Sequence, residues 1–116
     1  MKLDPDKLRA ALAEVEEGIV GPRSEVRVSE ADDYARFYHF DQLVRADYLR
    51  AIDAGNMQGH HYIVLDLTMT GHELLKKMRN DSVWAKAKSK IADLGGEVPI
   101  RILEKILDAG WDSIIT

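Results

Sequence analysis

The chain has 116 residues, of which 46% are hydrophobic and 31% charged, and its formal net charge is −4 at pH 7. This length predicts one domain over residues 1–116, and the composition is that of a folded globular protein rather than a disordered one. The absence of cysteine excludes disulfides and thiolate metal sites and favours a cytoplasmic location. No apolar run is long enough to span a bilayer, and the acidic start with Asp4 and Asp6 is unlike a secretory signal, so we expect no membrane partner.

The charges are distributed unevenly along the chain. Residues 1–35 hold nine acidic and five basic side chains, whereas residues 76–105 hold eight basic and four acidic ones. A protein that binds DNA mainly through phosphate contacts is usually basic overall, so DNA binding here would depend on a local patch. The acidic first third fits a basic protein partner equally well.

The first third predicts a helix followed by a short strand. Asp4 is a suitable N-cap, Pro5 suits the first helical position, and apolar residues then recur every three or four positions. Gly18 and the pair Gly21-Pro22 predict the end of this helix. Residues 25–29 alternate polar and apolar side chains, as a short edge strand does.

The middle of the chain predicts a helix and two strands. A helix over residues 34–46 leads into a strand over residues 48–52, and residues 62–67 alternate as a second strand. The first helix could instead continue to Ala54, but the strand at 62–67 needs a partner, which favours two strands. We expect Asp47 to adopt the left-handed conformation that turns the helix into the first strand.

A further helix follows the second strand. Thr70 and Glu73 form a capping box, and Thr68 is the competing cap. The helix is expected to break near residues 80–82, where Asp81 can cap the next helix.

The chain is expected to close with one more helix. Gly95-Gly96 predicts the end of the preceding helix, and Pro99 opens the last one, which Gly110 is expected to end. The apolar stripe from Leu103 to Ile115 is a candidate surface for a homodimer.

Motifs for catalysis or metal binding are incomplete. His72-Glu73 begins the zinc-protease pattern, but Lys76 stands where the second histidine would be. His60 and His61 are adjacent and would point to opposite faces of a strand, so they are not expected to share a metal ion. The chain has no serine elbow, phosphate loop or dinucleotide glycine pattern. We therefore expect a non-enzymatic protein with no catalytic residues, no cofactor and no metal.

The first candidate surface is a DNA-reading face on the helix over residues 34–46. Its polar side chains recur every three residues, and Arg and Gln can read base edges through two hydrogen bonds. The same spacing is typical of the solvated side of an amphipathic helix, and both interpretations stay open. In the first one, the tip of the two-stranded wing approaches the DNA backbone. The nucleic-acid-binding residues expected on this basis are Arg36, His39, Gln42, Arg45, Gln58, His60 and His61.

The alternative is a protein-binding module that inhibits a host factor, such as a phage counter-defence protein. It would present an acidic surface to a basic host protein. The residues expected to form this surface are Glu14, Glu16, Glu17, Asp32 and Asp33. If these acids share a face with the DNA-reading helix, DNA binding is disfavoured, because they would repel phosphate.

Two short motifs resemble a family of short, uncharacterised proteins from bacteria, phages and prophages, described as a domain of unknown function. Its members carry Leu-Thr-x-x-Gly-His-Glu and then Arg-x-Asp-x-x-Trp, which here are residues 67–73 and 79–84; Tyr38-His39-Phe40 matches an earlier segment. The resemblance covers roughly residues 34–107 and implies a winged-helix-like fold and a phage or prophage setting, without an activity. The family pattern has Gly where this chain has Asp47.

Together these patterns predict an α+β fold, namely a winged helix-turn-helix-like domain. Its short antiparallel wing is expected at about residues 48–67, with additional C-terminal helices at about residues 82–116. The function expected first is that of a small phage- or prophage-associated regulator that binds double-stranded DNA. The protein-binding module is the second expectation.

Overall fold

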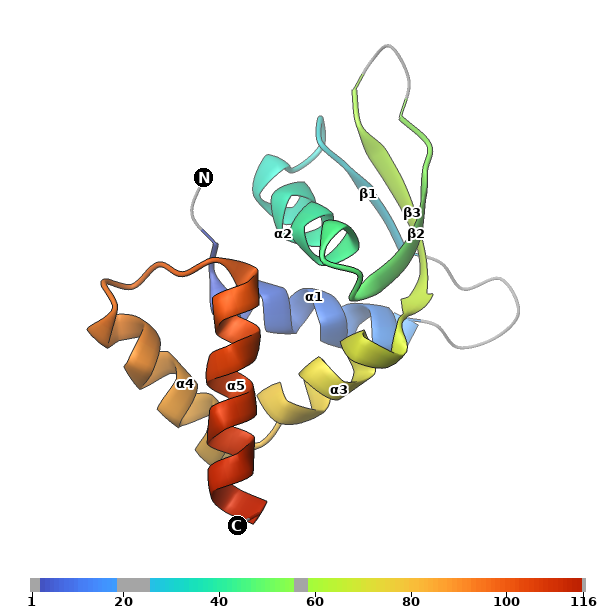
Figure 1. Ribbon diagram of the computed structural model, residues 1–116. Coiled ribbons are helices and arrows are strands. Elements are labelled where there is room, and N and C mark those ends of the chain that lie inside the picture. Colours follow the sequence, from blue (N-terminus) through green and yellow to red (C-terminus); the bar gives the residue numbers. More distant parts are fainter. Residues whose placement is uncertain (1–2, 19–25, 56–58, 116) are drawn as a thin grey trace.

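The computed structural model describes residues 3–18, 26–55 and 59–115. Within them the chain forms five helices and a three-stranded antiparallel sheet, which makes a mixed α+β fold as expected (Figure 1). The elements are α1 (Pro5–Gly18), β1 (Val26–Ser29), α2 (Tyr34–Arg45), β2 (Leu49–Asp53), β3 (His61–Leu67), α3 (Met69–Met78), α4 (Asp81–Asp93) and α5 (Ile100–Ile115). The expected helix terminator Gly21-Pro22 and the expected DNA contact Gln58 lie outside the described residues. In the described part of the chain, no helix is both long and apolar enough to cross a membrane.

The sheet has the strand order β1-β3-β2, so β3 is its central strand. β2 and β3 form the expected hairpin, and the expected edge strand β1 pairs with the other side of β3, with Val26 opposite Val64. The register between β2 and β3 shifts at Arg50 and Ala51, whose partners are Asp66 and Val64. Such a bulge increases the local twist of the strands at the point where the hairpin meets the helical part of the molecule.

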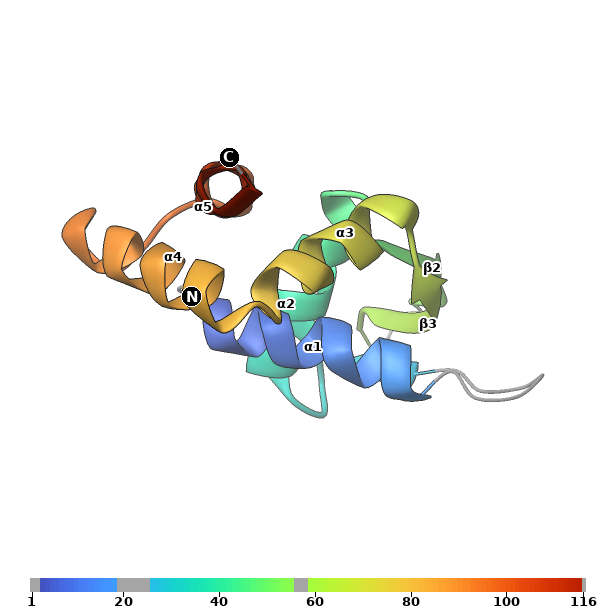
Figure 2. The ribbon, with the colours of Figure 1, turned by 90° about the horizontal axis from the view of Figure 1, so that it is seen from below.

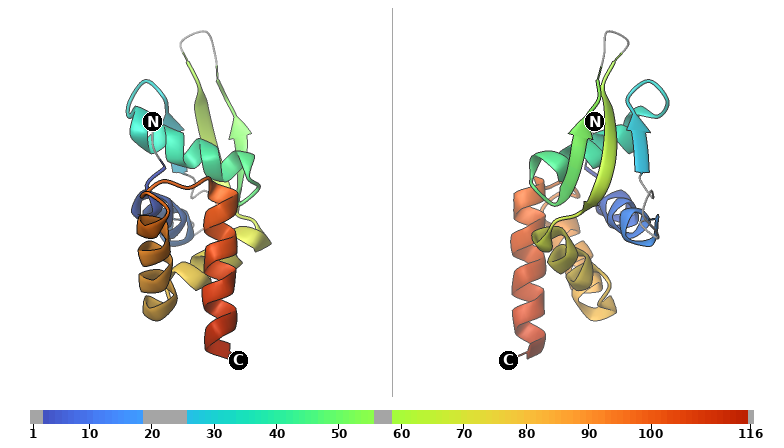
Figure 3. Two further views of the ribbon diagram at one scale, coloured as in Figure 1. Left: turned by 60° about the vertical axis from the view of Figure 1, so that its left-hand side comes forward. Right: turned by 90° about the vertical axis from the view of Figure 1, so that its right-hand side faces the viewer.

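Helix α2 covers one face of the sheet, and the opposite face carries no helix in the described part of the chain. On the covered face, the ring of Phe37 stacks on Tyr62 with 5.4 Å between the ring centroids, and Val28 and Val64 are buried. The right view of Figure 3 looks onto the opposite face. The other four helices gather at one end of the sheet; in Figure 2, α5 is seen end-on while α1 and α4 lie across the view.

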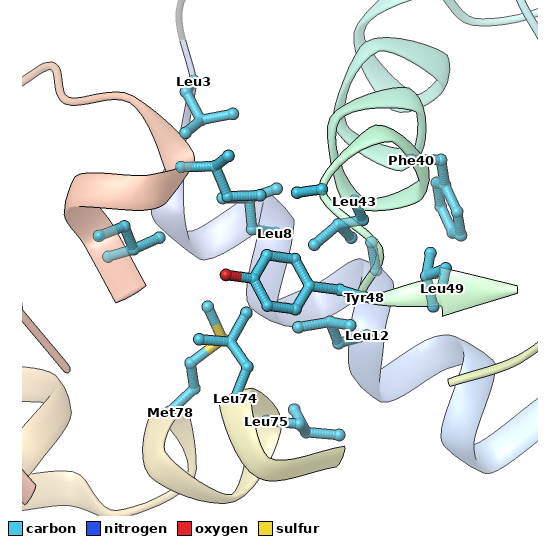
Figure 4. Packing of buried hydrophobic residues seen from close by; sticks show 14 of the residues in the cluster. Leu3, Leu8, Leu12, Phe40, Leu43, Tyr48, Leu49, Leu74, Leu75 and Met78 are labelled. Carbon is cyan, nitrogen blue, oxygen red and sulfur yellow. The ribbon is translucent and has the colours of Figure 1, made fainter. Parts of the chain in front are cut away.

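Tyr48 is the residue at which these helices meet the sheet. Its side chain is fully buried, and its hydroxyl donates a hydrogen bond to the carboxylate of Glu104 on α5. Because it touches elements from both halves of the chain, Tyr48 ties the helical layer to the hairpin. Its ring lies among side chains of α1, α2 and α3, including Leu8, Leu12, Leu43, Leu74 and Met78 (Figure 4).

The turn before Tyr48 and the turn before α3 hold each other in place. Asp47 adopts the expected left-handed conformation, with φ of 67°, and confirms the strand interpretation over a longer helix. The hydroxyl of Thr68 donates to the Asp47 carbonyl at 2.7 Å and accepts the Gly71 N–H at 3.0 Å. Thr68 is therefore the N-cap of α3, and the preference for a capping box starting at Thr70 is wrong because Thr70 is already helical.

Two other helix starts follow the capping rules with one correction. The carboxylate of Asp4 accepts the Asp6 N–H at 2.9 Å at the start of α1, as expected. Helix α4 is capped by Asn80, whose side chain accepts the Val83 N–H at 3.1 Å, so the expected cap Asp81 is instead the first helical residue. Asp81 still lies in the first turn, where a negative charge complements the helix dipole.

Helix α5 is longer than expected. It does not end at Gly110 but continues to Ile115, because Gly110 keeps a helical backbone instead of the left-handed conformation of a terminating glycine, and it lies beside Val83 of α4. Leu103 and Leu107 are fully buried inside the chain. The stripe expected to form a dimer surface is therefore used, at these two positions, for packing within one molecule.

Candidate interaction surface along helix α2

Arg36 is held by residues of its own chain. Its guanidinium donates two hydrogen bonds to the Glu14 carboxylate of α1, at 2.6 and 2.9 Å. It also lies over the ring of Phe40, 4.9 Å from the ring centroid. The side chains of Arg36 and Glu14 are 38% and 43% exposed, so the pair lies at the surface between α1 and α2. Arg36, expected to contact DNA, is thus bound to Glu14, expected to belong to the acidic protein-binding surface.

The four polar residues of α2 do not share one face. A helix turns about 100° per residue, so each three-residue step slips about 60°, and three steps carry Arg45 about halfway round the helix from Arg36. His39, between them, is only 2% exposed. The expectation of a single DNA-reading face over these residues is therefore corrected by helix geometry and by the burial of His39.

His39 connects α1 to α2. Its Nε2 accepts the backbone N–H of Asp4 at 2.9 Å, so the proton of the neutral ring is on Nδ1, which donates to the Ala35 carbonyl at 2.7 Å. Both ring nitrogens are thus occupied within the chain. This arrangement fixes the start of α1 against α2.

Replacing His39 with phenylalanine should therefore lower the free energy of unfolding. We expect a loss of about 1 kcal/mol, because the Asp4 N–H loses its acceptor. Urea unfolding gives the free energy, and hydrogen exchange should be faster at the first turn of α1. A side chain that only faced solvent would leave both measurements unchanged, which would contradict this role.

Arg45 and Gln42 lie in different surroundings. Arg45 is exposed and pairs with Asp41 one turn earlier, at 3.0 Å. Asp41 also accepts the Tyr62 hydroxyl at 2.7 Å, and burial together with this hydrogen bond raises the pKa of Tyr62 to about 12. Gln42 is half-buried and lines a cavity beside Tyr38 and Val98. Gln42 therefore faces a cavity, whereas Arg45 faces solvent beside Asp41.

His60 and His61, where β3 begins, make contacts with α2 and β1. The ring of His60 stacks on Phe37, with 6.0 Å between centroids, and the His60 carbonyl accepts the Glu30 N–H at 3.0 Å. His61 lies opposite Ser29 in the ladder between β1 and β3. His60 therefore belongs to the contact between the hairpin and α2.

The expected acidic surface is also partly used inside the chain. Glu16 of α1 pairs with Arg79 at the end of α3, and Glu17 approaches the same guanidinium at 3.8 Å. Asp33 is the N-cap of α2, where its carboxylate accepts the Arg36 N–H at 3.1 Å. Asp32 lies exposed in the preceding turn. With Glu14 bound to Arg36, the acids of α1 serve mainly to hold α2 and α3 against α1.

A furrow runs along α2 on the side away from the sheet. It consists of three cavities of about 440, 380 and 360 Å³. The first and second share Lys7, Ala35 and His39, and the second and third share Leu3, so the three adjoin one another. The left view of Figure 3 looks toward this side, where α2, the N-terminal segment and the segment leading into α5 lie close together. We call this feature the α2 furrow.

The α2 furrow brings together residues that are distant in the sequence. Glu14 and Arg36 lie in its first cavity, His39 is shared by the first two, and Gln42 lies in the third. Sequence reasoning missed Lys7, the alanines of α1, and the segment from Gly96 to Ile100. No local signal distinguishes these residues, since Lys7 has the spacing of a solvated helix position and the segment after α4 looks like an ordinary loop.

The comparisons with known proteins place the chain in a family. A family model described as a hypothetical protein (DUF2513) matches residues 2–97. The chain belongs to this family. A Haemophilus influenzae protein described as uncharacterized is 32% identical over an alignment of 113 residues that covers 91% of this chain and 92% of the relative. No solved structure matches the chain. The expectation of a family of uncharacterised proteins is confirmed, and the matched residues include α1 to α4.

The motif residues that suggested a family have structural roles in this chain. Thr68 caps α3, and Gly71 lies against the backbone of Tyr48. Arg79 pairs with Glu16, and Trp84 is buried on α4 with the Arg9 guanidinium 5.3 Å from its ring centroid. Thr68 and Gly71 hold α3 against the turn before β2, and Arg79 and Trp84 hold α3 and α4 against α1, so these four motif residues have packing roles in the fold.

Proposed function

We propose that the chain is a non-enzymatic protein-binding module that holds a segment of a partner protein in the α2 furrow. The observation that carries this proposal is the row of three adjoining cavities, of 440, 380 and 360 Å³, along one exposed side of α2. Cavities of this size with apolar walls and a few polar groups are typical of binding sites. A row of them is suited to an extended segment rather than to a compact ligand.

The walls of the furrow support this proposal. Ala10, Ala11 and Phe40 line the first cavity, and Val98 and Ile100 line the third. Small and apolar side chains along a furrow leave room for alternate side chains of a peptide, while polar groups at its margins fix the orientation. The furrow therefore replaces the acidic residues of α1 as the proposed contact surface, because those acids are paired within the chain.

A module of this kind would act by occupying part of a host factor. This is the mode of action of an inhibitor carried by a phage or prophage, and it requires no reaction at the bound segment. The proposed location is the cytoplasm, which is consistent with a sequence without cysteine.

Filling the furrow is expected to abolish binding. Peptides would be selected from a random display library on the immobilised full chain, and their affinities measured by calorimetry. Ala10 is exposed on α1 and lines the first cavity, so Ala10→Trp should weaken a selected peptide at least about tenfold by excluding it sterically. Exposed Ala85 on α4 does not line the α2 furrow, which makes Ala85→Trp the matched control.

The control variant should bind as the wild type does, and both variants should keep the wild-type unfolding midpoint. A library that yields no specific peptide, or equal affinities for both tryptophan variants, would contradict binding in the furrow.

The second candidate is the DNA-binding regulator with a winged-helix-like fold. The observation in its favour is the order α2, β2, β3 together with a hairpin that extends past α2 (Figure 1). Against it, β1 leads into α2 through a short turn where a helix-turn-helix would have another helix, and Arg36 and Arg45 are paired with acids. Titration of duplex DNA over a salt series distinguishes the two candidates. A binding constant that falls steeply with salt, and that is lost in the double variant Arg36→Ala with Arg45→Ala, supports the regulator. No binding at low salt rejects it.

A further inference from the structure

We propose that Arg36 forms a carboxylate-binding subsite in the α2 furrow and that Glu14 occupies this subsite while no partner is bound. The partner segment would supply a glutamate or aspartate side chain in place of Glu14. This inference rests on the proposed function and specifies the chemistry of the segment that the furrow accepts.

The guanidinium of Arg36 is positioned before any partner arrives. The guanidinium lies over the ring of Phe40, 4.9 Å from its centroid, and the hydrogen bond from the Arg36 N–H to the Asp33 carboxylate holds its backbone. The two hydrogen bonds to Glu14, at 2.6 and 2.9 Å, have the parallel geometry in which Arg recognises carboxylates. Glu14 thus shows which group this site accepts.

The charges around the cavity favour an acidic segment once Glu14 has moved aside. The first cavity is lined by two cations, Lys7 and Arg36, and by two acids, Glu14 and Asp33. Asp33 is engaged as the N-cap of α2, where the helix dipole also compensates its charge. Removal of Glu14 leaves an excess of positive charge that one incoming carboxylate would neutralise.

Displacing Glu14 requires little energy. Both side chains of the pair are more than a third exposed, so water can solvate Glu14 as it leaves, and the incoming carboxylate would re-form the same two hydrogen bonds with Arg36. Glu16, on the same helix as Glu14, pairs with Arg79 at the end of α3; neither residue lines the α2 furrow, so this pair is not expected to exchange partners in this way.

The test uses two capped tripeptides, acetyl-Leu-Glu-Leu-amide and acetyl-Leu-Gln-Leu-amide, titrated into the 15N-labelled full chain. The Glu tripeptide should shift the Arg36 Nε–H signal and the amides of α1 and α2, and the Gln tripeptide should bind more weakly. Glu14→Gln should bind the Glu tripeptide up to about fivefold more tightly, which corresponds to about 1 kcal/mol. Glu17→Gln, which removes a more exposed charge from the same helix, should bind as the wild type does.

Arg36→Lys should remove most of the preference for Glu over Gln, because an ammonium group cannot reproduce the two parallel hydrogen bonds. If both tripeptides shift the same amides equally, in the wild type and in Glu14→Gln, the carboxylate subsite is overturned while binding in the furrow stands. If the Glu tripeptide shifts no furrow amides even in Glu14→Gln, the subsite is also overturned, and the library selection then decides separately whether the furrow binds peptides.

Discussion

Replacing Gly71 with alanine is expected to destabilise the protein by about 3 kcal/mol, because there is no room for a β carbon at this position. A β carbon on Gly71 would lie 2.0 Å from the carbonyl oxygen of Tyr48 and 3.0 Å from its carbonyl carbon. Both are backbone atoms, so the clash cannot be relieved by rotating a side chain. The same oxygen accepts the Thr68 N–H at 3.1 Å, and moving it away would weaken the junction between β2 and α3. Urea unfolding measures the loss.

Gly110 provides the matched control, since it is also a helical glycine. A β carbon there would lie 3.4 Å from Cγ1 of Val83, an ordinary packing distance. Glycine inside a helix costs about 0.5–1 kcal/mol relative to alanine, so Gly110→Ala should stabilise the protein by up to that amount. The two substitutions should therefore change the free energy of unfolding in opposite directions: Gly71→Ala should lower it and Gly110→Ala should raise it. Similar effects of both would show that the backbone contact between Gly71 and Tyr48 does not govern stability.

The fold was predictable where local chemistry determines it. Asp47 tolerates a left-handed turn, and this one residue separates α2 from β2 as the sequence indicated. The expectation at Gly110 is wrong because a glycine near the end of a helical pattern usually terminates the helix, whereas here Gly110 is an interior residue of α5 beside Val83 of α4. A terminating glycine and a glycine inside a helix are distinguished here by the packing of α4 against α5. The local sequence around Gly110 does not specify that packing.

The candidate site was predictable only in part. The spacing of polar residues predicts Arg36 and Gln42 as site residues, and both line the α2 furrow. The pairing of Arg36 with Glu14 joins residues 22 positions apart, and the contact between His39 and Asp4 spans 35 positions. Such contacts depend on how α1 packs across α2, which periodicity within either helix does not specify. The sequence therefore predicts two separate surfaces, one with Arg36 and one with Glu14, whereas the fold brings these two residues together.

Removing the hydroxyl of Tyr48 is the second substitution with a large expected effect. Tyr48→Phe keeps the buried ring but leaves the carboxylate of Glu104 without the hydrogen bond it accepts. A hydrogen bond to a charged group contributes about 1.5–3 kcal/mol, so we expect a loss of about 2 kcal/mol at neutral pH. Urea unfolding measures it, and Tyr34→Phe, at an exposed tyrosine, is the control expected to have little effect.

The size of this loss should depend on pH in a defined direction. Burial, and then the hydrogen bond to Glu104, raise the pKa of Tyr48 above its ordinary value near 10. Above pH 10 the unfolded chain loses the Tyr48 proton while the folded chain keeps it, so the unfolded state binds fewer protons and the wild-type stability falls as the pH rises. The phenylalanine variant lacks this contribution, and the difference between the two proteins should shrink above about pH 10. A difference that stays constant from neutral to alkaline pH would show that the pKa of Tyr48 is not raised in the folded protein, and no difference at any pH would show that Tyr48 stabilises the core through its ring alone.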